Sequence, residues 1–508
     1  MKKRNIITAL TAVMTGISAA ALPLAAELPT ALVAEAASTV TGTTADGFRY
    51  SYQSGSSKAK IIGYTGTATS ITIPSKVAGK TVTEIGDEAF SYLDDHNVRR
   101  GLNITSVTFP NTVKTIGEYA FCKCPLTSLT LPANVTAIKG SAFSSCYELT
   151  SVNVQGAAAL YSSAFAACTK LRNVRLNAGC TRAQGAAHIF NSCTSLVNLN
   201  GNPVVRNSTD ENGNPMPVLS VSSTTAGLIR TFFTDTSKVK FIDTYCSAIC
   251  KYVVDTETRS WMSETVKARQ LHDWLVRHCE YEDGYGWNGT GTETLGDENN
   301  HIYSSVFLSY GLNERGSGVG ETVCEGFSKA YTMLLNQAGI ESYVLSAGLT
   351  PIGRQQYPDQ TISGHAWNLV KADGKYYQCD ITADDCAAWQ TGATGSYNTI
   401  YTCFLKNRAV METLHSNAQG LLFTAPTIPV IYTPEHPLLN YNKAQGDAAL
   451  NQCIYTLNDT NADGILDNDW DFNGTVNQQD TRIRQNLVSM YGGNITQSWW
   501  LRTRILTT

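Results

Sequence analysis

A motif that returns about every 22 residues constrains the possible folds of this chain more than any other feature of its sequence. In each copy a phenylalanine is followed by a cysteine and then by a leucine, and a short run of alternating apolar and polar residues comes next, as at residues 129–132. The cysteines of the four copies, Cys124, Cys146, Cys168 and Cys193, lie 22, 22 and 25 residues apart. One such unit cannot bury its apolar side chains alone, whereas stacked copies share a continuous core. The sequence therefore predicts a solenoid, which we place at residues 37–222.

The cysteines of the repeats are expected to be packed thiols rather than disulfide partners or metal ligands, because each returns at a fixed position among apolar residues. The period and the pattern resemble the leucine-rich repeats of bacterial surface antigens. This resemblance implies one strand and a short turn or helix in each coil. It also implies a regular exposed face that binds a surface or protein ligand or serves as a spacer. The residues of the repeats do not indicate which ligand would bind.

The N-terminus has the composition of a secretory signal peptide. Met1, Lys2, Lys3 and Arg4 precede an apolar stretch, and small residues surround Ala36. This order predicts a signal peptide over residues 1–36 with cleavage near Ala36. An uncleaved membrane anchor is the alternative, although Thr, Ser, Gly and Pro interrupt the apolar stretch. Because no later segment approaches the length of a membrane span, we expect a secreted, extracellular protein without a transmembrane span, attached to a scaffold or to the cell surface.

Length and charge restrict the class of protein further. With 508 residues the chain is too long for one hydrophobic core and should fold into several domains. Its 38 Lys and Arg against 42 Asp and Glu leave a formal net charge of −4, without a dense basic run after the first four residues. This balance argues against nucleic acid as a partner.

From residue 223 the pattern changes to longer helical and strand periods, and we place a second domain at residues 223–425. Apolar residues at helical spacing around Trp274 predict an amphipathic helix, and a second helix is expected directly after Cys324. Residues 342–345, 365–370 and 375–379 have the pattern of strands, the last two joined as a hairpin. These elements predict an α+β fold. A Pro-rich segment within residues 426–445 has the composition of a linker.

Three side chains of this second domain form a candidate catalytic triad. Cys324 stands at the start of a predicted helix, where the helix dipole favours a thiolate and the first N–H groups can bind an oxyanion. His365 lies in a predicted strand as the candidate base. Asp380 ends the neighbouring strand, from which its carboxylate can fix the tautomer of the imidazole.

Three motifs that contain these residues resemble the transglutaminase-like superfamily. They are Val323-Cys324-Glu325-Gly326-Phe327, Gly364-His365-Ala366-Trp367-Asn368 and Tyr377-x-x-Asp380-x-Thr382, and the helix with Trp274 and Tyr281 also fits. The resemblance implies a papain-like fold, a Cys-His-Asp triad and thiol acyl transfer on a peptide or protein substrate without a catalytic cofactor. Hydrolysis, as in a protease or amidase, is the expected outcome, and cross-linking to an amine is the alternative. The superfamily also has inert members, so a repeat-based binding or adhesion protein within an extracellular complex is the second hypothesis.

The remaining cysteines and histidines of this region lack comparable neighbours. Cys279, Cys379, Cys386 and Cys403 are expected to be packing residues or to form a disulfide. No metal-ligand spacing is present at His272, His278 and His301.

The last region, residues 446–508, contains a loop with the spacing of calcium ligands. Oxygen-bearing side chains alternate along residues 469–480, and Gly474 at the sixth position permits the sharp turn. A similar loop begins upstream, but Trp470 occupies its twelfth position, and the two loops share one aspartate without a helix between them. The predicted metal ligands are Asp469, Asp471, Asn473, Thr475, Asn477 and Asp480, and upstream Asp459, Asn461 and Asp463.

This tail resembles a degenerate dockerin, the small α-helical module that attaches enzymes of a cellulosome to a cohesin-bearing scaffold. The resemblance implies a structural Ca2+ ion and a cohesin-bearing scaffold protein as partner. We expect such a module to be dispensable for the fold and the chemistry of the catalytic domain. An acidic, solvated loop is the alternative. The whole chain is thus predicted to be multidomain, with a leucine-rich-repeat solenoid, an α+β transglutaminase-like domain and a dockerin-like tail.

Overall fold

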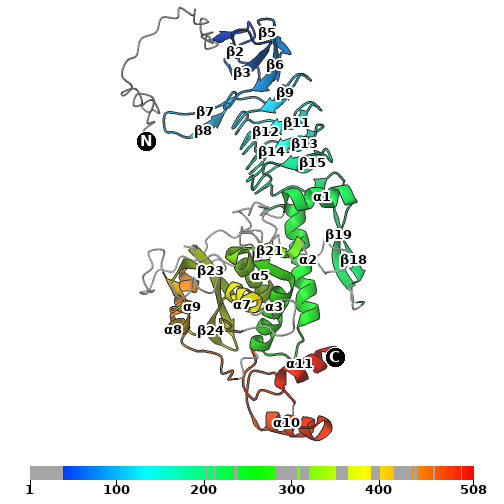
Figure 1. Ribbon diagram of the computed structural model, residues 1–508, viewed down its shortest axis with the longest axis vertical. Coiled ribbons are helices and arrows are strands. Elements are labelled where there is room, and N and C mark those ends of the chain that lie inside the picture. Colours follow the sequence, from blue (N-terminus) through cyan, green and yellow to red (C-terminus); the bar gives the residue numbers. More distant parts are fainter. Residues whose placement is uncertain are drawn as a thin grey trace, which may run out of the picture.

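The computed structural model describes residues 38–201, 203–209, 213, 215–233, 238–281, 306–308, 320–350, 364–390, 401–416, 438–439, 443–460, 464–493 and 495–507. The chain runs from an elongated β-solenoid through a unit of helices and strands to a small helical tail (Figure 1). No helix in these ranges combines the length and the apolar character needed to cross a membrane. The predicted signal peptide, linker residues 426–437, His301, Asn461 and Asp463 lie outside the described residues.

The solenoid is built from short strands of successive coils. The strands are β1 Thr39–Thr43, β2 Phe48–Gln53, β3 Lys58–Tyr64, β4 Ser70–Thr72, β5 Lys76–Val77, β6 Lys80–Ile85, β7 Ser91–Leu93, β8 Arg99–Gly101, β9 Ser106–Thr108, β10 Thr115–Ile116, β11 Ser128–Leu131, β12 Ala137–Ile138, β13 Ser151–Val154, β14 Ala159–Leu160, β15 Asn173–Leu176, β16 Thr181–Arg182 and β17 Asn198–Leu199. One nine-stranded sheet has the order β1-β2-β3-β6-β10-β12-β14-β16, with β5 paired to β6. A four-stranded sheet has the order β11-β13-β15-β17, and β4 pairs with β9 and β7 with β8.

Each regular coil contributes two strands, where the sequence predicted one. The parallel register advances by one repeat at a time, so that Ile116 pairs with Ile138 and Ile138 with Leu160. The turns are left-handed at repeat-related positions, with φ of 54° at Tyr119 and 52° at Ser141. Among the described residues of the coils there is no helix, so turns alone close each coil.

Phenylalanine rings form a continuous stack inside the solenoid. Phe121, Phe143, Phe165 and Phe190 stack at centroid distances of 5.4 Å. Each repeat thiol lies beside this stack and donates a hydrogen bond to a phenylalanine carbonyl of the preceding coil, with sulfur to oxygen distances of 3.2 to 3.3 Å. Burial raises the pKa of the Cys124 thiol to about 12. The prediction of packed thiols is confirmed, and the stack explains the period, because each coil must supply one ring.

The core of the solenoid continues into the second unit. The hairpin of β18 (Val204–Thr209) and β19 (Pro215–Ser220) follows the last coil, and α1 (Ser223–Phe232) and α2 (Lys240–Glu257) come next. Phe233 stacks on Phe190 of the last coil at 5.1 Å, and its ring meets Phe241 of α2 edge-on at 5.3 Å. One apolar core therefore spans the predicted boundary at residue 222.

The second unit packs helices beside an antiparallel sheet. Its helices are α3 (Glu264–His278), α5 (Cys324–Gln337) and α7 (Ile381–Gln390), and its strands are β20 (Cys279–Tyr281), β21 (Gly320–Thr322), β22 (Ser342–Leu349), β23 (Gly364–Ala372), β24 (Lys375–Cys379) and β25 (His415–Ser416). The sheet order is β24-β23-β22-β25, and β20 pairs with β21. The Tyr331 hydroxyl of α5 donates to the Ala268 carbonyl of α3 at 3.0 Å, which joins the two central helices. The predicted helix after Cys324 and the predicted hairpin correspond to α5 and to β23 with β24.

Residues assigned by sequence to the linker and the tail pack into this second unit. Helix α8 (Arg408–Met411) precedes β25, and α9 (Lys443–Asn451) follows the part of the chain that is not described. Ala449, Leu450 and Cys453 are buried in the apolar cluster that contains Trp367 of β23. Their apolar side chains cover the sheet, so α9 and the residues directly after it are part of the second unit.

The tail contains α10 (Gln478–Tyr491) and α11 (Gln497–Thr507) after two turn-rich loops. Among its described residues, no apolar cluster consists of tail side chains alone. Ile465, Phe472 and Leu501 pack together with Met262 and Val266, which belong to the second unit around the start of α3. The tail and the second unit therefore share an apolar cluster.

Candidate active site

The candidate nucleophile Cys324 is the first residue of α5. Val323 precedes it as the N-cap in an extended conformation and supplies no side-chain cap, so no capping side chain competes with the thiol for the positive end of the helix dipole. Cys324 is 9% exposed and packs against Val344 of β22 and Ala366 of β23. The thiol is thus mostly desolvated and retains an exposed edge.

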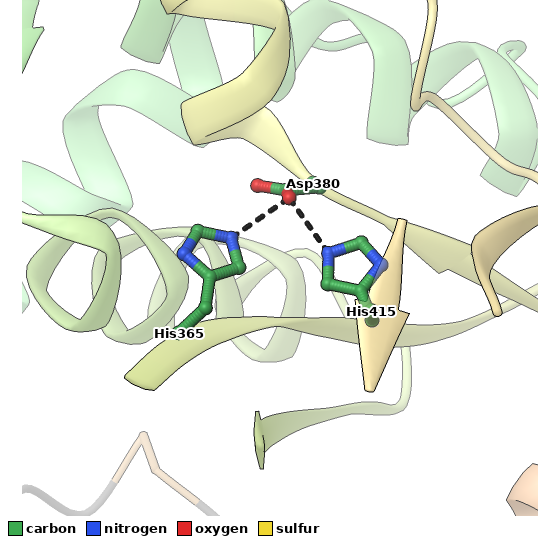
Figure 2. A group of neighbouring side chains, drawn as sticks. All are labelled: His365, Asp380 and His415. Atoms are coloured by element: carbon green, nitrogen blue, oxygen red, sulfur yellow. Dashed lines mark hydrogen bonds and ion pairs between the residues drawn. The ribbon is translucent and has the colours of Figure 1, made fainter. Parts of the chain in front are cut away.

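His365 and Asp380 form a buried pair beside this thiol. Nε2 of His365 lies 2.8 Å from Oδ2 of Asp380 (Figure 2). Nδ1 is therefore the ring nitrogen that remains to exchange a proton with Cys324. Burial lowers the pKa of His365, but the charge of Asp380 and the neighbouring Cys324 outweigh burial and raise the pKa to about 10. Burial opposes ionisation of Asp380, yet His365 and His415 hold the pKa of that carboxyl well below its usual value. At neutral pH the pair is therefore an imidazolium and a carboxylate.

Hydrogen bonds of Asn368 position the strand that carries His365. The amide nitrogen of Asn368 donates to the Ser328 carbonyl at 2.8 Å and to Oγ1 of Thr332 at 2.9 Å. Both acceptors belong to α5, whose first residue is Cys324. The candidate base and the candidate nucleophile are therefore held in register by polar contacts between a strand and a helix.

A second histidine contacts the same carboxylate. Nε2 of His415, in β25, lies 3.0 Å from Oδ2 of Asp380, so the carboxylate is flanked by two imidazoles (Figure 2). Nδ1 of His415 lies 2.9 Å from the Met411 carbonyl oxygen, and its ring stacks on Trp367 at 4.1 Å. Sequence reasoning missed His415, because no motif marks it and only the pairing of β25 with β22 brings it to the site.

A separate buried network joins α3 to α7. Nε2 of His272 lies 3.1 Å from Oδ2 of Asp384, and Nδ1 lies 3.2 Å from Oδ1 of Asp273. Burial lowers the pKa of His272, but the two carboxylates raise it to about 9. Oδ1 of Asp384 accepts the N–H of Cys403 at 2.8 Å. These bonds anchor α7, the helix that begins directly after Asp380.

Three of the four cysteines that the sequence left between packing and disulfide roles are packing residues, and the side chain of Cys386 lies outside the described part of the chain. No disulfide occurs among the cysteines that the structure describes. Cys279, Cys379 and Cys403 are buried, and burial raises the pKa of the Cys379 and Cys403 thiols well above the usual value. Such thiols are poor nucleophiles, which distinguishes them from a thiol beside an imidazolium.

The tail brings three of the predicted calcium ligands together. Asp469, Asp471 and Asp480 are buried, and each offers an oxygen within 4.8 Å of the other two. Burial raises the pKa of Asp469 to about 6, although N–H groups of Gly474 and Asn473 act in the opposite direction. Carboxylates this close repel one another, and a hard cation with oxygen ligands relieves that repulsion. The residues therefore fit a calcium ion.

Other predicted ligands of this loop make local contacts. Oδ1 of Asn473 accepts the N–H of Thr475 at 2.9 Å, and the amide nitrogen of Asn473 donates to Asp471 at 2.8 Å. Asn477 is the N-cap of α10 and forms a capping box with Asp480. The loop is thus pre-shaped by its own hydrogen bonds, and Asp480 links it to the helix that follows.

The upstream loop repeats one contact of the downstream loop. Oδ2 of Asp459 accepts the N–H of Gly464 at 2.6 Å, as Oδ2 of Asp469 accepts the N–H of Gly474 at 2.8 Å. Both glycines have positive φ, 75° and 83°, a conformation that side chains rarely adopt. The first and sixth positions therefore have equivalent geometry in both loops.

Comparison with known proteins identifies the solenoid. Residues 96–209 match the BspA type Leucine rich repeat region in six copies. The chain therefore contains BspA-type leucine-rich repeats that form an N-terminal β-solenoid. No curated protein matches the chain.

Several solved structures are similar to parts of the chain. A leucine-rich repeat protein of T. pallidum is 24% identical over 31% of this chain and 70% of that chain, with a TM-score of 0.27. A leucine-rich repeat protein from Bacteroides capillosus is 28% identical over 22% of this chain and 81% of that chain, with a TM-score of 0.19. A structure described as a TGase is 22% identical over 28% of this chain and 32% of that chain, with a TM-score of 0.19. At such TM-scores these likenesses add nothing to the assignment of the site.

Proposed function

We propose that the second unit is a secreted cysteine enzyme of the transglutaminase-like class, which transfers acyl groups from peptide or amide bonds. The observation that carries this proposal is the position of His365, held by Asp380 through Nε2 beside Cys324 at the N-terminus of α5. A thiol next to an imidazolium and a helix N-terminus has the environment that stabilises a thiolate. A peptide or protein is the substrate class that such a nucleophile attacks.

The residues of the site suffice for a two-step acyl transfer. The Cys324 thiolate attacks the carbonyl carbon, and N–H groups at the start of α5 receive the oxyanion. The His365 imidazolium gives its Nδ1 proton to the leaving amine, the C–N bond breaks, and a thioester remains. Water then attacks the thioester while His365 takes its proton, and cleavage of the C–S bond returns the thiolate. Asp380 stays ionised and holds the imidazole in position throughout.

Hydrolysis is the outcome we propose, because water is the default acceptor outside the cell. An amine in place of water would make the same thioester a cross-linking intermediate. The solenoid would bind a surface or protein ligand and so bring the site to its substrate. The tail would carry a structural Ca2+ ion and attach the protein to a cohesin-bearing scaffold.

The test combines turnover with labelling of the thiol. Fluorogenic peptide amides report turnover, and an iodoacetamide probe followed by peptide mapping reports the reactivity of Cys324. We expect Cys324→Ala to lose turnover by about a thousandfold or more, with an unchanged fold because alanine is a good helix former. His365→Gln should slow labelling of Cys324. Cys168→Ala in the solenoid is the matched control and should keep full turnover.

Turnover retained by Cys324→Ala would refute the proposal. Hydroxylamine or a primary amine added to the assay separates the two acceptors, since incorporation of the amine into product would favour cross-linking over hydrolysis. Calcium is not expected to affect the chemical step itself, because the acidic loop lies in the tail.

A repeat-based binding or adhesion protein is the second candidate, favoured by the BspA-type repeats. The hairpin of β7 and β8 projects from the solenoid (Figure 1), and Tyr92, Leu93 and Val98 are exposed there. Two results together would favour this function over catalysis. The full chain would bind cell surfaces or extracellular proteins equally well with and without Cys324→Ala, and Cys324 of the unsubstituted protein would not react with the probe.

A further inference from the structure

His415 is a buried titratable group to which the proposed mechanism assigns no task. Both of its ring nitrogens face atoms that only accept hydrogen bonds. Nδ1 lies 2.9 Å from the Met411 carbonyl oxygen, which has no hydrogen to give. Nε2 lies 3.0 Å from Oδ2 of Asp380, and an ionised carboxylate is likewise acceptor-only. Each nitrogen must therefore carry a hydrogen, so the contacts define His415 as an imidazolium.

The surroundings of His415 agree with a cation at this place. Asp380 accepts from Nε2 of His415, from Nε2 of His365 and, through Oδ1, from the N–H of Ala383 at 3.2 Å. The neighbouring His365 and His415 hold the pKa of the Asp380 carboxyl well below its usual value, against the effect of burial. The face of the His415 ring stacks on Trp367. A buried charge is tolerated when it is paired and hydrogen bonded, and this pair meets both conditions.

The charged groups around the ring are few among the described residues. Asp380 contacts the ring directly, and the His365 ring lies 5.5 Å away between centroids. On α8, Arg408 pairs with Glu412 at 2.7 Å, so those two charges offset each other. The carboxylate of Asp380 therefore has one cationic partner that faces the thiol and one, His415, that faces away from the reacting atoms.

We propose that His415 is a positioning residue of the candidate site, a cation that holds Asp380 in place and offsets part of its negative charge at His365. This inference rests on the proposed function of Cys324 and His365. Because Asp380 is already paired with His415, its carboxylate orients the imidazole of His365 but binds the proton of that imidazole less strongly. Transfer of that proton to a leaving amine is easier as a consequence.

The charge of His415 has a measurable effect on the two groups that react. A nearby positive charge favours the thiolate of Cys324 and disfavours the imidazolium of His365. Removal of that charge should move both ionisations to higher pH. Two charges whose rings lie 5.5 Å apart in a protein interior are expected to shift each other by about one to two pH units.

The experiment follows the rate of Cys324 alkylation by iodoacetamide against pH in the full-length protein. A thiolate and imidazolium pair gives a reactivity window with an acidic and a basic limb. His415→Gln keeps an N–H donor for Asp380 but no charge, and His415→Phe keeps a ring on Trp367 but neither donor nor charge. We expect the basic limb, which reports His365, to move upward by about one to two pH units in both variants, and the acidic limb to move in the same direction. The plateau should fall further, by about tenfold, in His415→Phe alone because Asp380 loses a donor.

His278→Gln is the matched control, since His278 is another largely buried histidine whose Nδ1 faces a backbone carbonyl, that of Trp274 at 2.7 Å. It should leave both limbs in place. A lower plateau with unmoved limbs in the His415 variants would show a merely structural role and overturn the inference. A profile of an ordinary thiol in the unsubstituted protein would instead overturn the proposed function of Cys324.

A measurement without substitution covers the case in which the variants do not fold. In protein labelled with 15N-histidine at neutral pH, both nitrogens of His415 should show imidazolium shifts, because both face acceptor atoms. A signal of an unprotonated nitrogen from His415 at that pH would contradict the inference.

Discussion

Phe472 is the residue through which we expect loop 469–480, with the calcium ion proposed there, to stabilise the second unit. It occupies the fourth position of loop 469–480, with φ of 61°, and its side chain is fully buried. Its ring lies 6.0 Å from that of Trp261, and it shares an apolar cluster with Met262 and Val266. The chain turns sharply at this position to direct the ring out of the ligand loop and into the neighbouring unit.

The magnitude of the effect of Phe472→Ala follows from burial. Truncation of a fully buried phenylalanine removes its transfer free energy and leaves a cavity, which costs about 3–5 kcal/mol. A calcium ion at a hundred times its dissociation constant stabilises the folded tail by about 2.7 kcal/mol. That stabilisation reaches the second unit through the shared cluster and through a few polar contacts, such as Arg504 over the ring of Trp261 at 3.9 Å. In Phe472→Ala, calcium should therefore raise the melting temperature of the second unit much less than in the unsubstituted protein.

Calorimetry of the full-length protein with calcium or with EDTA measures this coupling. In the unsubstituted protein we expect EDTA to lower the melting temperature of the catalytic unit as well as that of the tail. Leu487→Ala is the matched control, because Leu487 is buried on α10 but lies outside the shared cluster. It should destabilise the tail and preserve the coupling. The reasoning is refuted if EDTA leaves the catalytic transition of the unsubstituted protein unchanged, or if Phe472→Ala retains the full calcium effect on that transition.

Three further outcomes are expected. Asp480→Ala should weaken calcium binding measured by titration calorimetry and also lower the helicity of α10, because Asp480 is both a candidate ligand and the capping-box partner of Asn477. The folded-state pKa of Asp469, about 6, lies above the ordinary value of 3.8, so the stability of the calcium-free tail should fall as pH rises from 3.8 through 6. Melting of the tail in EDTA at about pH 4.5 and pH 7 tests this, and calcium should abolish the trend. His365 and His272 have folded-state pKa values of about 10 and about 9, above the ordinary histidine value of 6.5. Their contribution to the stability of the second unit should therefore be complete below pH 6.5 and be lost as pH rises through 9 and 10, which thermal unfolding against pH measures.

The features that could be predicted from sequence are those whose signal is local. A phenylalanine and a cysteine at a fixed period predict the solenoid, because every coil must add one ring to the stack and one thiol beside it. The approach of Asp380 to His365 was foreseeable from a hairpin with a short turn, in which Asn368 pairs with Cys379. In each case the residues that meet are close in sequence or repeat at a constant interval.

The features that could not be predicted depend on contacts between distant segments. The second strand of each coil has only two residues, as in Thr115–Ile116, which is too short for an alternating pattern. His415 reaches Asp380 through a two-residue pairing of β25 with β22. Phe472 stands within an acidic loop whose spacing predicts ligands, and nothing local shows that its ring is buried against Trp261. Burial of this kind has no period that a sequence could display.

Docking of the tail on the catalytic unit and attachment of the protein to a partner are compatible. The tail buries Ile465, Phe472 and Leu501 against the catalytic unit. On α10 and near the start of α11, Tyr491 and Trp499 remain exposed and meet edge-on at 5.4 Å, so another face of the tail is free to receive a scaffold protein. A partner that bound this exposed face would leave the shared cluster intact. A calcium ion in this loop would then stabilise both contacts, since the loop that shapes the start of α10 also directs Phe472 into the second unit.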